Sequence, residues 1–384
     1  MSIKCRFVDS LASVTPAAWD QLALRDNPFL SHAFLYGLEQ TGCLGGQSGW
    51  YPNHLLAESN GQLLAAAPCY VKTNSMGEYV FDWAWADAYQ RNGQNYYPKL
   101  LTAVPYSPVI GPRLLVSKNA GQVNGLQQHM LEAKTEYCNQ QGLSSWHINF
   151  PEAAEYHIYK DIRCDTLERF DWQFHWYNRD FECFADFLAS LNHKKRKNIR
   201  QERSAIARAG IECDMQTAGE STEAELDFAV RCYQRTFMNK GNPPMLKRRF
   251  FLHLANAMPD QLLISLARQD GQLIAAAIFL RGGDRLYGRY WGCMVQIPAL
   301  HFELCYYQGI DYCIRHRLAA FEPGAQGEHK IPRGFQPTRT RSLHYIQDPV
   351  YRKAIGDYLE QEADWLESYH LRLQDRLPFR HVKP

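Results

Sequence analysis

Residues 321–345 hold the densest set of polar side chains in the chain, and those side chains could do acid–base chemistry. Glu328 and His329 are the leading candidates for proton transfer, with Glu322 second, because carboxylates and imidazoles can be tuned toward neutral pH. Neighbouring side chains of an extended segment point to opposite faces, so Glu328 and His329 are not expected to face one substrate together. The alternative is a solvated surface loop whose charges pair with one another.

Other side chains could bind a substrate or a leaving group. Lys330, Arg333 and His344 lie in the same stretch. Arg113 lies in a rigid loop rich in Pro and Gly and could clamp a carboxylate or phosphate. Tyr290 could donate a proton to a leaving group, although such residues are more often sheet core. None of these candidates has metal-ligand spacing, so we expect no metal site.

A strongly basic segment is the second candidate site. Its cations are Lys194, Lys195, Arg196, Lys197 and Arg200. Ile199 and Ile206 fall on one stripe and Gly210 suits a C-terminal stop, which predicts a helix over residues 192–209. Like charges repel on an isolated helix, so the run favours a phosphate-bearing partner, either an RNA backbone or the diphosphate of a nucleotide-linked precursor. The alternative is a solvated helix face.

An internal repeat indicates how these residues are positioned. Residues 60–67 recur as residues 270–277, an offset of 210, and each copy begins with the Asn-Gly or Asp-Gly signal of a tight hairpin. Tyr96-Tyr97 matches Tyr306-Tyr307 at the same offset, and Tyr137-Cys138 matches Tyr312-Cys313 at an offset of 175. We therefore expect one architecture written twice, with about 35 extra residues in the first copy.

Each copy is predicted to contain a strand, two helices, three antiparallel strands, a helix and a strand. Residues 89–104 are expected to be mostly helical, and residues 105–113 to form a rigid loop of the extra segment. A long helix over residues 349–377 closes the chain. This order predicts an α/β (α+β) fold of two fused domains, at residues 1–178 and 179–384, with mixed, mainly antiparallel sheets covered by helices.

Bulk composition describes an ordinary folded protein. The chain has 384 residues, 46% of them apolar, and its net charge of +2 points to no class of partner. Its 11 cysteines are scattered singly, which favours reduced thiols over a disulfide framework or a zinc site. The N-terminus lacks a long apolar run, and no segment approaches the ~20 apolar residues of a membrane span. We expect a cytoplasmic protein without a transmembrane segment.

The repeat, the basic helix and the polar stretch together resemble the FemAB-like proteins. These are tandem relatives of the GNAT acyltransferases, described as peptidoglycan biosynthesis or recognition proteins. The resemblance covers essentially the whole chain and is most specific in NHKKRKNIR from Asn192, FEPGAQGEHK from Phe321 and RGF from Arg333. It implies two fused GNAT-like domains that transfer an acyl or aminoacyl group to an amine, carried by a small molecule or a cell-wall precursor.

The donor stays open at this point. GNAT enzymes that use acetyl-CoA usually carry Q/R-x-x-G-x-G/A before the central helix, where backbone N–H groups hold the pyrophosphate. Residues 291–301 lack the paired glycines, which counts against acetyl-CoA. Related transferases take an amino acid from aminoacyl-tRNA, so we expect aminoacyl-tRNA or an acyl-CoA as donor and no tightly bound cofactor. Two alternatives remain: an acetyl-CoA-dependent N-acetyltransferase, and a non-catalytic module that recognises a cell-wall precursor or RNA.

Overall fold

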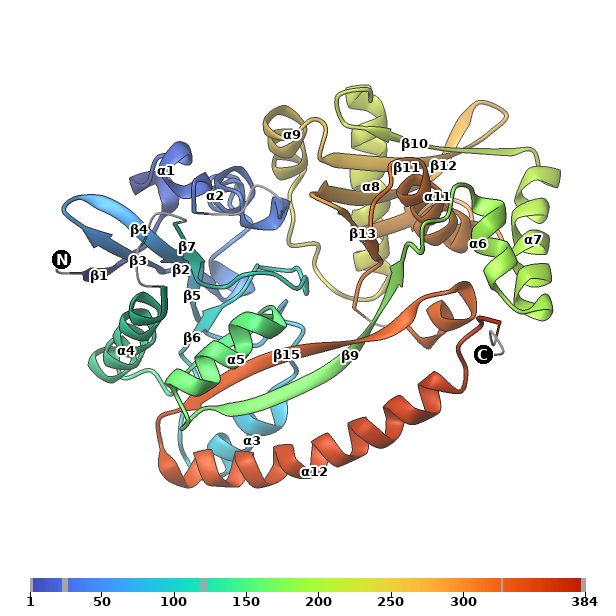
Figure 1. Ribbon diagram of the computed structural model, residues 1–384. Helices are drawn as coiled ribbons and strands as arrows, with labels where there is room; N and C mark the ends of the chain where they lie inside the picture. Colours follow the sequence, from blue (N-terminus) through green and yellow to red (C-terminus); the bar gives the residue numbers. More distant parts are fainter. Residues whose placement is uncertain (1–2, 23–26, 118–119, 121–122, 326, 381–384) are drawn as a thin grey trace. The chain divides into compact units, whose positions relative to one another are not determined.

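The computed structural model describes the chain except for residues 1–2, 23–26, 118–119, 121–122, 326 and 381–384. Gln326, within the polar stretch, therefore lies outside the described residues. The chain forms two compact units, whose elements are labelled in Figure 1. Unit 1 consists of Met1–Trp172 and Arg339–Ser368, and unit 2 consists of Gln173–Thr338 and Tyr369–Pro384.

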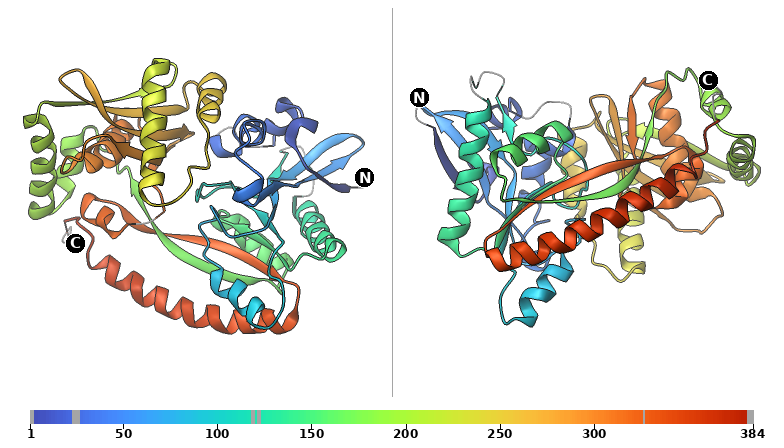
Figure 2. Two further views of the ribbon diagram at one scale, coloured as in Figure 1. Left: turned by 180° about the vertical axis from the view of Figure 1, so that it is seen from behind. Right: turned by 60° about the horizontal axis from the view of Figure 1, so that its bottom comes forward.

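Unit 1 is built on two sheets. Its elements are β1 (Lys4–Val8), α1 (Pro16–Asp20), α2 (His32–Gln40), β2 (Trp50–Pro52), β3 (His54–Ser59), β4 (Gln62–Ala67), β5 (Cys69–Lys72), α3 (Trp83–Arg91), β6 (Lys99–Thr102), β7 (Leu115–Val116), α4 (Val123–Gln141), β8 (Ser145–Asn149) and α5 (Ala153–Ile162). The strand orders are β1-β3-β4-β7 and β15-β8-β6-β5-β2. Only β6 and β8 run parallel; the other neighbouring strands are antiparallel. α4 packs along β1, β3, β6 and β8, as Figure 2 shows.

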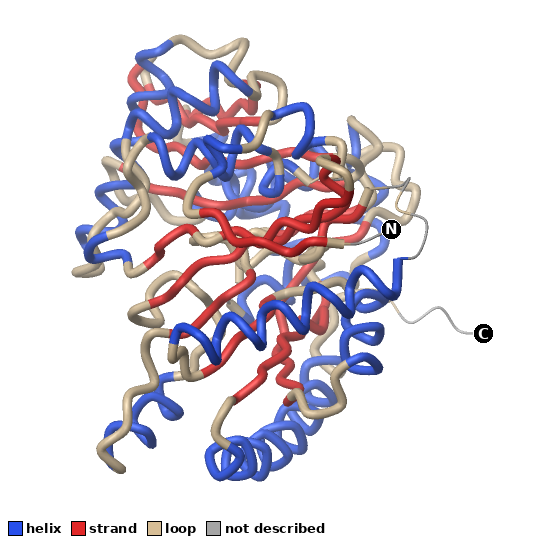
Figure 3. Tube along the Cα trace, turned by 90° about the vertical axis from the view of Figure 1, so that its left-hand side faces the viewer, coloured by secondary structure: helices blue, strands red, loops and turns tan. Residues whose placement is uncertain are grey.

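Unit 2 is built on one sheet. Its elements are α6 (Phe184–Ser190), α7 (His193–Arg208), β10 (Ile211–Thr217), α8 (Glu223–Asn239), α9 (Arg248–Ala257), β11 (Leu262–Gln269), β12 (Gln272–Gly282), β13 (Arg285–Cys293), α10 (Leu300–Phe302), the π-helical turn η4 (Glu303–Tyr307), α11 (Gln308–Arg315), β14 (Ala320–Glu322) and the 3₁₀ helix η5 (Glu328–Arg333). The strand order is β10-β11-β12-β13-β14-β9, and only β13 and β14 run parallel. Figure 3 distinguishes the helices and strands along the chain by colour. These sheets confirm the predicted α/β (α+β) class.

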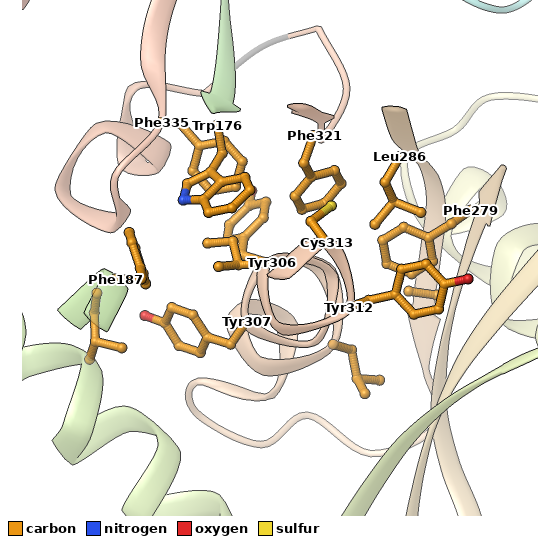
Figure 4. Close-up of a cluster of buried hydrophobic side chains, with 14 of the residues drawn as sticks. Trp176, Phe187, Phe279, Leu286, Tyr306, Tyr307, Tyr312, Cys313, Phe321 and Phe335 are labelled. Atoms are coloured by element: carbon orange, nitrogen blue, oxygen red, sulfur yellow. The ribbon is translucent and has the colours of Figure 1, made fainter. Parts of the chain in front are cut away.

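The core of unit 2 forms around its central helix. Figure 4 shows Tyr306, Tyr307 and Tyr312 projecting from η4 and α11 in different directions, among aromatic side chains from the strands and from α6. Tyr306 packs on Phe335 with ring centroids 5.3 Å apart. On the other side of the sheet, Gly292 lets α8 approach β13, because a Cβ there would lie 2.0 Å from the Cys232 carbonyl oxygen.

Each unit is completed by a strand that follows the other unit in sequence. β9 (Leu167–Tyr177) follows α5 of unit 1, yet its end pairs with β14 in unit 2. β15 (Gln336–Ile346) follows η5 of unit 2, yet its end pairs with β8 in unit 1, and α12 (Pro349–Gln374) comes next. The compact units therefore differ from a simple cut near residue 178, since Arg339–Ser368 packs with the first unit.

The internal repeat is present in the backbone. Asn60-Gly61 and Asp270-Gly271 both adopt positive φ in the turns of the β3–β4 and β11–β12 hairpins. Each hairpin carries its register shift at the same place, after Ala57 in one and after Ala267 in the other. Residues related by the offset of 175 also make equivalent hydrogen bonds. The Cys138 thiol donates to the Ser145 carbonyl, and the Cys313 thiol donates to the Ala320 carbonyl.

Two details of the predicted repeat are wrong. Residues 89–104 were expected to be mostly helical, but the helix ends at Arg91 and Lys99–Thr102 form β6, which is buried between β5 and β8. Tertiary burial overrides local helix propensity there. The match of Tyr96-Tyr97 with Tyr306-Tyr307 is a coincidence, because the first pair precedes β6 whereas the second lies in η4, after β13.

Side-chain caps explain where several helices begin. The Thr15 hydroxyl accepts from the Ala18 amide at the start of α1, with Pro16 in the first turn. Asn192 caps α7 by accepting from the Lys195 amide, so the predicted basic helix is confirmed. Among the described helices, none combines the length and apolar character that a membrane span requires.

Candidate functional site

The parallel pair β13–β14 marks the candidate site, which lies wholly in unit 2. The strands pair from Arg285 opposite Ala320 to Tyr287 opposite Glu322, and the pairing then stops. β13 bulges just beyond this point, because β12 opposes Gly288 and Tyr290 with consecutive residues and leaves Arg289 extra. In open α/β sheets, ligands bind outside the carboxyl ends of such strands.

A pocket of about 110 Å³ lies where the two strands separate. Its lining residues come from β12, β13, the start of the central helix and the end of β14: Ala277, Ile278, Phe279, Gly288, Arg289, Tyr290, Trp291, His301, Cys305, Tyr306 and Pro323. Arg289 is the only cation that is always charged in this set, and the set contains no Asp or Glu. The pocket therefore has an electropositive lining.

The π-helical turn η4 brings two side chains to the pocket. Glu303–Tyr307 hydrogen-bond in the π pattern, and single π turns are frequent at functional sites. Cys305 and Tyr306 from this turn line the pocket. Burial raises the pKa of Cys305 above its ordinary range, so its thiol is protonated and suited to packing rather than to attack.

Two histidines flank Tyr306. The Tyr306 hydroxyl and His329 Nε2 lie 2.7 Å apart in a hydrogen bond, and the His301 ring lies 5.2 Å from the Tyr306 ring. Burial lowers the pKa of His301 to about 4, and burial with the charges of Lys330 and Arg333 lowers the pKa of His329. Both imidazoles are therefore neutral near pH 7, and a neutral imidazole can accept a proton.

The backbone of the polar stretch sets His329 in place. Glu328 and His329 lie in the helix η5 rather than in the extended segment predicted. Gly327 adopts φ +121°, and a Cβ there would lie 2.4 Å from the His329 ring. The two side chains have different partners, because Glu328 contacts Tyr369 and Arg376 whereas His329 contacts Tyr306.

Lys330 is not in the pocket lining, but it bonds to the chain beside it. Its ammonium donates a 2.7 Å hydrogen bond to the Gly324 carbonyl, next to the lining residue Pro323. The side chain is 2% exposed. Burial lowers the pKa of Lys330 to about 7.

The two predicted carboxylates lie outside the pocket lining. Glu328 accepts from the Tyr369 hydroxyl at 2.6 Å and pairs with Arg376, contacts that lower its pKa and make it a weaker base. Glu322 is buried and pairs with Arg285 at 3.1 Å, and its other oxygen lies 4.0 Å from His175 Nε2. Both carboxylates are held by cations.

Tyr290 does line the pocket, and it is also part of an aromatic group. Its ring lies 4.7 Å from Tyr233 and 6.3 Å from Phe251. Tyr290 therefore belongs to an aromatic group at the wall of the pocket, and its role as a proton donor stays a prediction.

The basic helix α7 is tied to the elements of the pocket. Glu202 pairs with Arg333 of η5 at 2.7 Å, and Arg203 pairs with Glu303 of η4 at 3.2 Å. Among the described residues, the ion pairs of α7 use Glu202 and Arg203 and none of the five predicted cations. Lys194, Lys197 and Arg200 are exposed, and Lys195 and Arg196 are half-buried.

Arg113 and His344 lie in unit 1 and are not in the lining of the unit 2 pocket. Arg113 is fully buried, and its guanidinium donates to four carbonyls, those of Asn149, Gly111, Pro112 and Val109. His344 is buried with Nδ1 2.7 Å from His147 Nδ1, and burial lowers its pKa to about 3. The substrate-binding roles predicted for these two residues find no support in this geometry.

A larger hollow of about 380 Å³ lies in unit 1, along α12 and the start of β9. Its charged lining is largely paired internally: Arg169 with Glu362 at 2.7 Å and Lys160 with Glu168 at 3.0 Å. The smaller pocket of unit 2 is the better candidate, because it lies at the carboxyl ends of a parallel pair and collects neutral titratable groups.

The sequence analysis missed Tyr306 and Cys305. The available signal was their place in the first turns of the helix that follows a strand of a parallel pair. Predicting it required β13 and β14 to be recognised as neighbours, and no local sequence signal shows that pairing.

Comparisons with known proteins are consistent with this architecture. A crystal structure of FemX superposes with a TM-score of 0.53 at 11% identity, covering 93% of this chain and 100% of that chain. L-PGS from Bacillus licheniformis gives 0.51 at 12% identity, covering 89% and 96%. The C-terminal domain of a putative lysylphosphatidylglycerol synthetase from Agrobacterium fabrum gives 0.51 at 9% identity, covering 90% and 94%.

No curated protein sequence matches the chain. The family model described as FemAB-like, peptidoglycan biosynthesis/recognition, matches residues 10–381. The chain belongs to the FemAB-like family and shares the fold of FemX.

Proposed function

We propose that the protein is an acyltransferase that moves an acyl or aminoacyl group to an amine acceptor in the pocket of unit 2. The observation that carries the proposal is this pocket at the carboxyl ends of β13 and β14, in a chain of the FemAB-like family. The family's description favours a cell-wall precursor as the carrier of the amine.

Transfer to an amine forms one C–N bond, breaks the bond from the acyl carbon to its leaving group, and moves one proton from nitrogen to that leaving group. Tyr306 is placed to donate this proton, and its hydrogen bond to neutral His329 orients the hydroxyl. Neutral His301 is placed to accept the proton of the attacking amine.

Only some of the residues predicted from sequence have a role in the proposed transfer. His329 acts through Tyr306, and Tyr290 forms part of the wall. Glu328 and Glu322 are held in ion pairs outside the lining, so we assign the proton transfers to Tyr306 and the histidines instead.

The exposed cations of α7 support a phosphate-bearing substrate, either aminoacyl-tRNA or a nucleotide-linked precursor. Because no carboxylate pairs with the five cations among the described residues, their charge is available to phosphates. The same observation favours a second candidate, a non-catalytic module that recognises such a ligand. An acyl-CoA remains the alternative donor, and an acetyl-CoA-dependent N-acetyltransferase is the narrower form of that alternative.

A thermal-shift screen followed by a turnover assay tests the proposal. The screen compares coenzyme A, a nucleotide-sugar precursor and an aminoacyl-RNA mimic, and the class that stabilises the protein supplies the substrates for the assay. Product formation that is lost in Tyr306→Phe supports the transferase. Binding without any transfer, in the parent protein as in the variant, supports the recognition module instead.

A further inference from the structure

Lys330 is a buried cation with a single hydrogen-bond partner. Its side chain is 2% exposed, and its ammonium donates to the Gly324 carbonyl alone among the described residues. An ammonium group has three N–H donors, and burying its charge without a counter-ion is costly. Such a group either loses its proton or gains an anion.

Among the described residues, the groups recorded as interacting with the charge of Lys330 include no carboxylate. The groups that interact with its charge come from β9, β13, α10, η4 and η5 itself: His175, Arg289, His301, Cys305 and His329. Arg333, also on η5, adds a further positive charge near His329. The histidines have lowered pKa values and are neutral near pH 7. Burial, assisted by Arg289, lowers the pKa of Lys330 to about 7, so only part of the population is charged near neutral pH.

In unit 1 the carbonyl at the same position is satisfied by a cation that has several partners in its own loop. The strand registers and the offset of 175 place Asn149 of unit 1 at the position of Gly324. The Asn149 carbonyl also accepts from a buried cation, Arg113, at 2.7 Å. Arg113 has three further carbonyl partners from its own loop, whereas Lys330 has none.

We propose that Lys330 and Arg289 form a subsite for an oxyanion, a carboxylate or phosphate group of the substrate, in the pocket between β13 and β14. Arg289 lines the pocket, and the residues recorded in the lining include no Asp or Glu. Lys330 is bonded to Gly324, next to the lining residue Pro323, and a volume of about 110 Å³ suits a group of this size. The inference deepens the proposed function, since it uses the same pocket, but it rests on binding and not on transfer.

Binding of an anion beside Lys330 should be coupled to the uptake of a proton. An anion favours the charged form of Lys330, so at a pH above its value in the empty pocket, binding takes up a proton from solvent. Below that pH the ammonium is already present, and binding takes up none. Uptake should therefore approach one proton per anion at about pH 8 and fall toward zero at about pH 6.

Isothermal titration calorimetry on the full chain measures this uptake. Acetate and sulfate are the probes, because neither titrates in this range and they stand for the carboxylate and phosphate sources respectively. Each is titrated at about pH 6 and about pH 8 in two buffers of different ionisation enthalpy. The probe that binds with proton uptake identifies the class of anion.

Three variants test whether the anion binding and the proton uptake depend on Lys330. Lys330→Met keeps the length of the side chain without its charge and should weaken binding by about tenfold or more while abolishing uptake. Lys330→Arg keeps a charge that cannot be lost, so it should bind the anion without uptake. Lys353→Met, on the exposed face of α12, is the matched control and should change neither quantity.

Two results would overturn the inference. One is that neither anion binds the parent protein at either pH. The other is that Lys330→Met binds as the parent does, with the same uptake. If Lys330→Met does not fold, Lys330→Arg still decides, because uptake that persists in it cannot come from Lys330. This experiment measures binding and proton uptake but not turnover. A negative result would therefore not contradict the transferase proposal, and a negative transfer assay would not contradict the anion subsite.

Discussion

The parallel strand pairs β6–β8 of unit 1 and β13–β14 of unit 2 lie at matching positions of the internal repeat. They differ in how the first strand of the pair continues. In unit 2, Gly288 and Gly292 of β13 are separated by Arg289, Tyr290 and Trp291, and β13 is continuous. The registers place Thr102 and Leu115 at the same two positions in unit 1, where they are separated by residues 103–114. The same strand is therefore interrupted into β6 and β7 in unit 1.

By register, the inserted loop replaces the segment of residues 289–291, which lines the pocket of unit 2. Val104, Tyr106, Val109 and Leu114 of the loop are buried, and Arg113 joins the loop to the Asn149 carbonyl at the end of β8. One architecture thus yields a packed interior in one unit and an open pocket in the other. The difference teaches that the pocket arises where the chain leaves the separated strands unfilled. It supports the proposal that the chemistry takes place in unit 2.

The largest loss of turnover is expected from a substitution of Tyr306 in the pocket lining. Tyr306→Phe removes the hydroxyl that faces His329 and should lower turnover by about 10²–10⁴-fold, the usual contribution of a positioned acid. Tyr312→Phe is the matched control, because its hydroxyl accepts from Arg281 outside the pocket lining. Steady-state kinetics on both variants checks this, and equal losses would place the reaction elsewhere.

In unit 1 we expect a large loss of stability without a loss of turnover. Arg113→Met leaves four buried carbonyls without their donor and should lower the free energy of unfolding by about 3–5 kcal/mol. Urea unfolding followed by fluorescence measures it. Turnover per folded molecule should stay unchanged, and a specific loss of turnover would show that unit 1 takes part in the chemistry.

The corresponding change in unit 2 should act in the opposite direction. Lys330→Met removes a buried charge with one partner and should raise the free energy of unfolding by on the order of 1 kcal/mol at about pH 6. The folded pKa lies below the unfolded one, so the penalty is complete below about pH 7 and fades as pH rises toward about 10. Thermal unfolding at several pH values tests the sign, and a destabilised variant at every pH would contradict it.

Charge reversal on α7 should have a smaller, salt-dependent effect. Lys195→Glu with Arg196→Glu should weaken binding of an RNA oligonucleotide by about tenfold at low salt and make its salt dependence shallower. Fluorescence anisotropy over a salt series measures both quantities. Binding that ignores both salt and the substitutions would remove α7 from substrate recognition.

The smallest effect is expected at the carboxylate that the sequence favoured most. Glu328→Gln should change turnover by less than about threefold, because Tyr369 and Arg376 already hold this half-exposed side chain outside the lining. The same kinetic assay applies. A loss as large as that of Tyr306→Phe would restore Glu328 as the base.

The fold could be predicted because its signals are local or repeated. The Asn-Gly and Asp-Gly turns, the Thr15 and Asn192 caps and the two offsets follow from short stretches of sequence. The site was located only roughly, because the partners of a titratable group are set by pairings distant in sequence. Glu328 finds Arg376 and Tyr369, His329 finds Tyr306, and Arg113 finds Asn149, and none of these contacts has a local signature.

A structure with a donor analogue bound tests most directly the claim that unit 2 alone holds the reaction centre. The account predicts that the reacting carbonyl lies between Gly288 and Pro323, within hydrogen-bond reach of Tyr306. A ligand whose reacting carbonyl is bound in unit 1, beside Arg113 or along α12, would contradict it.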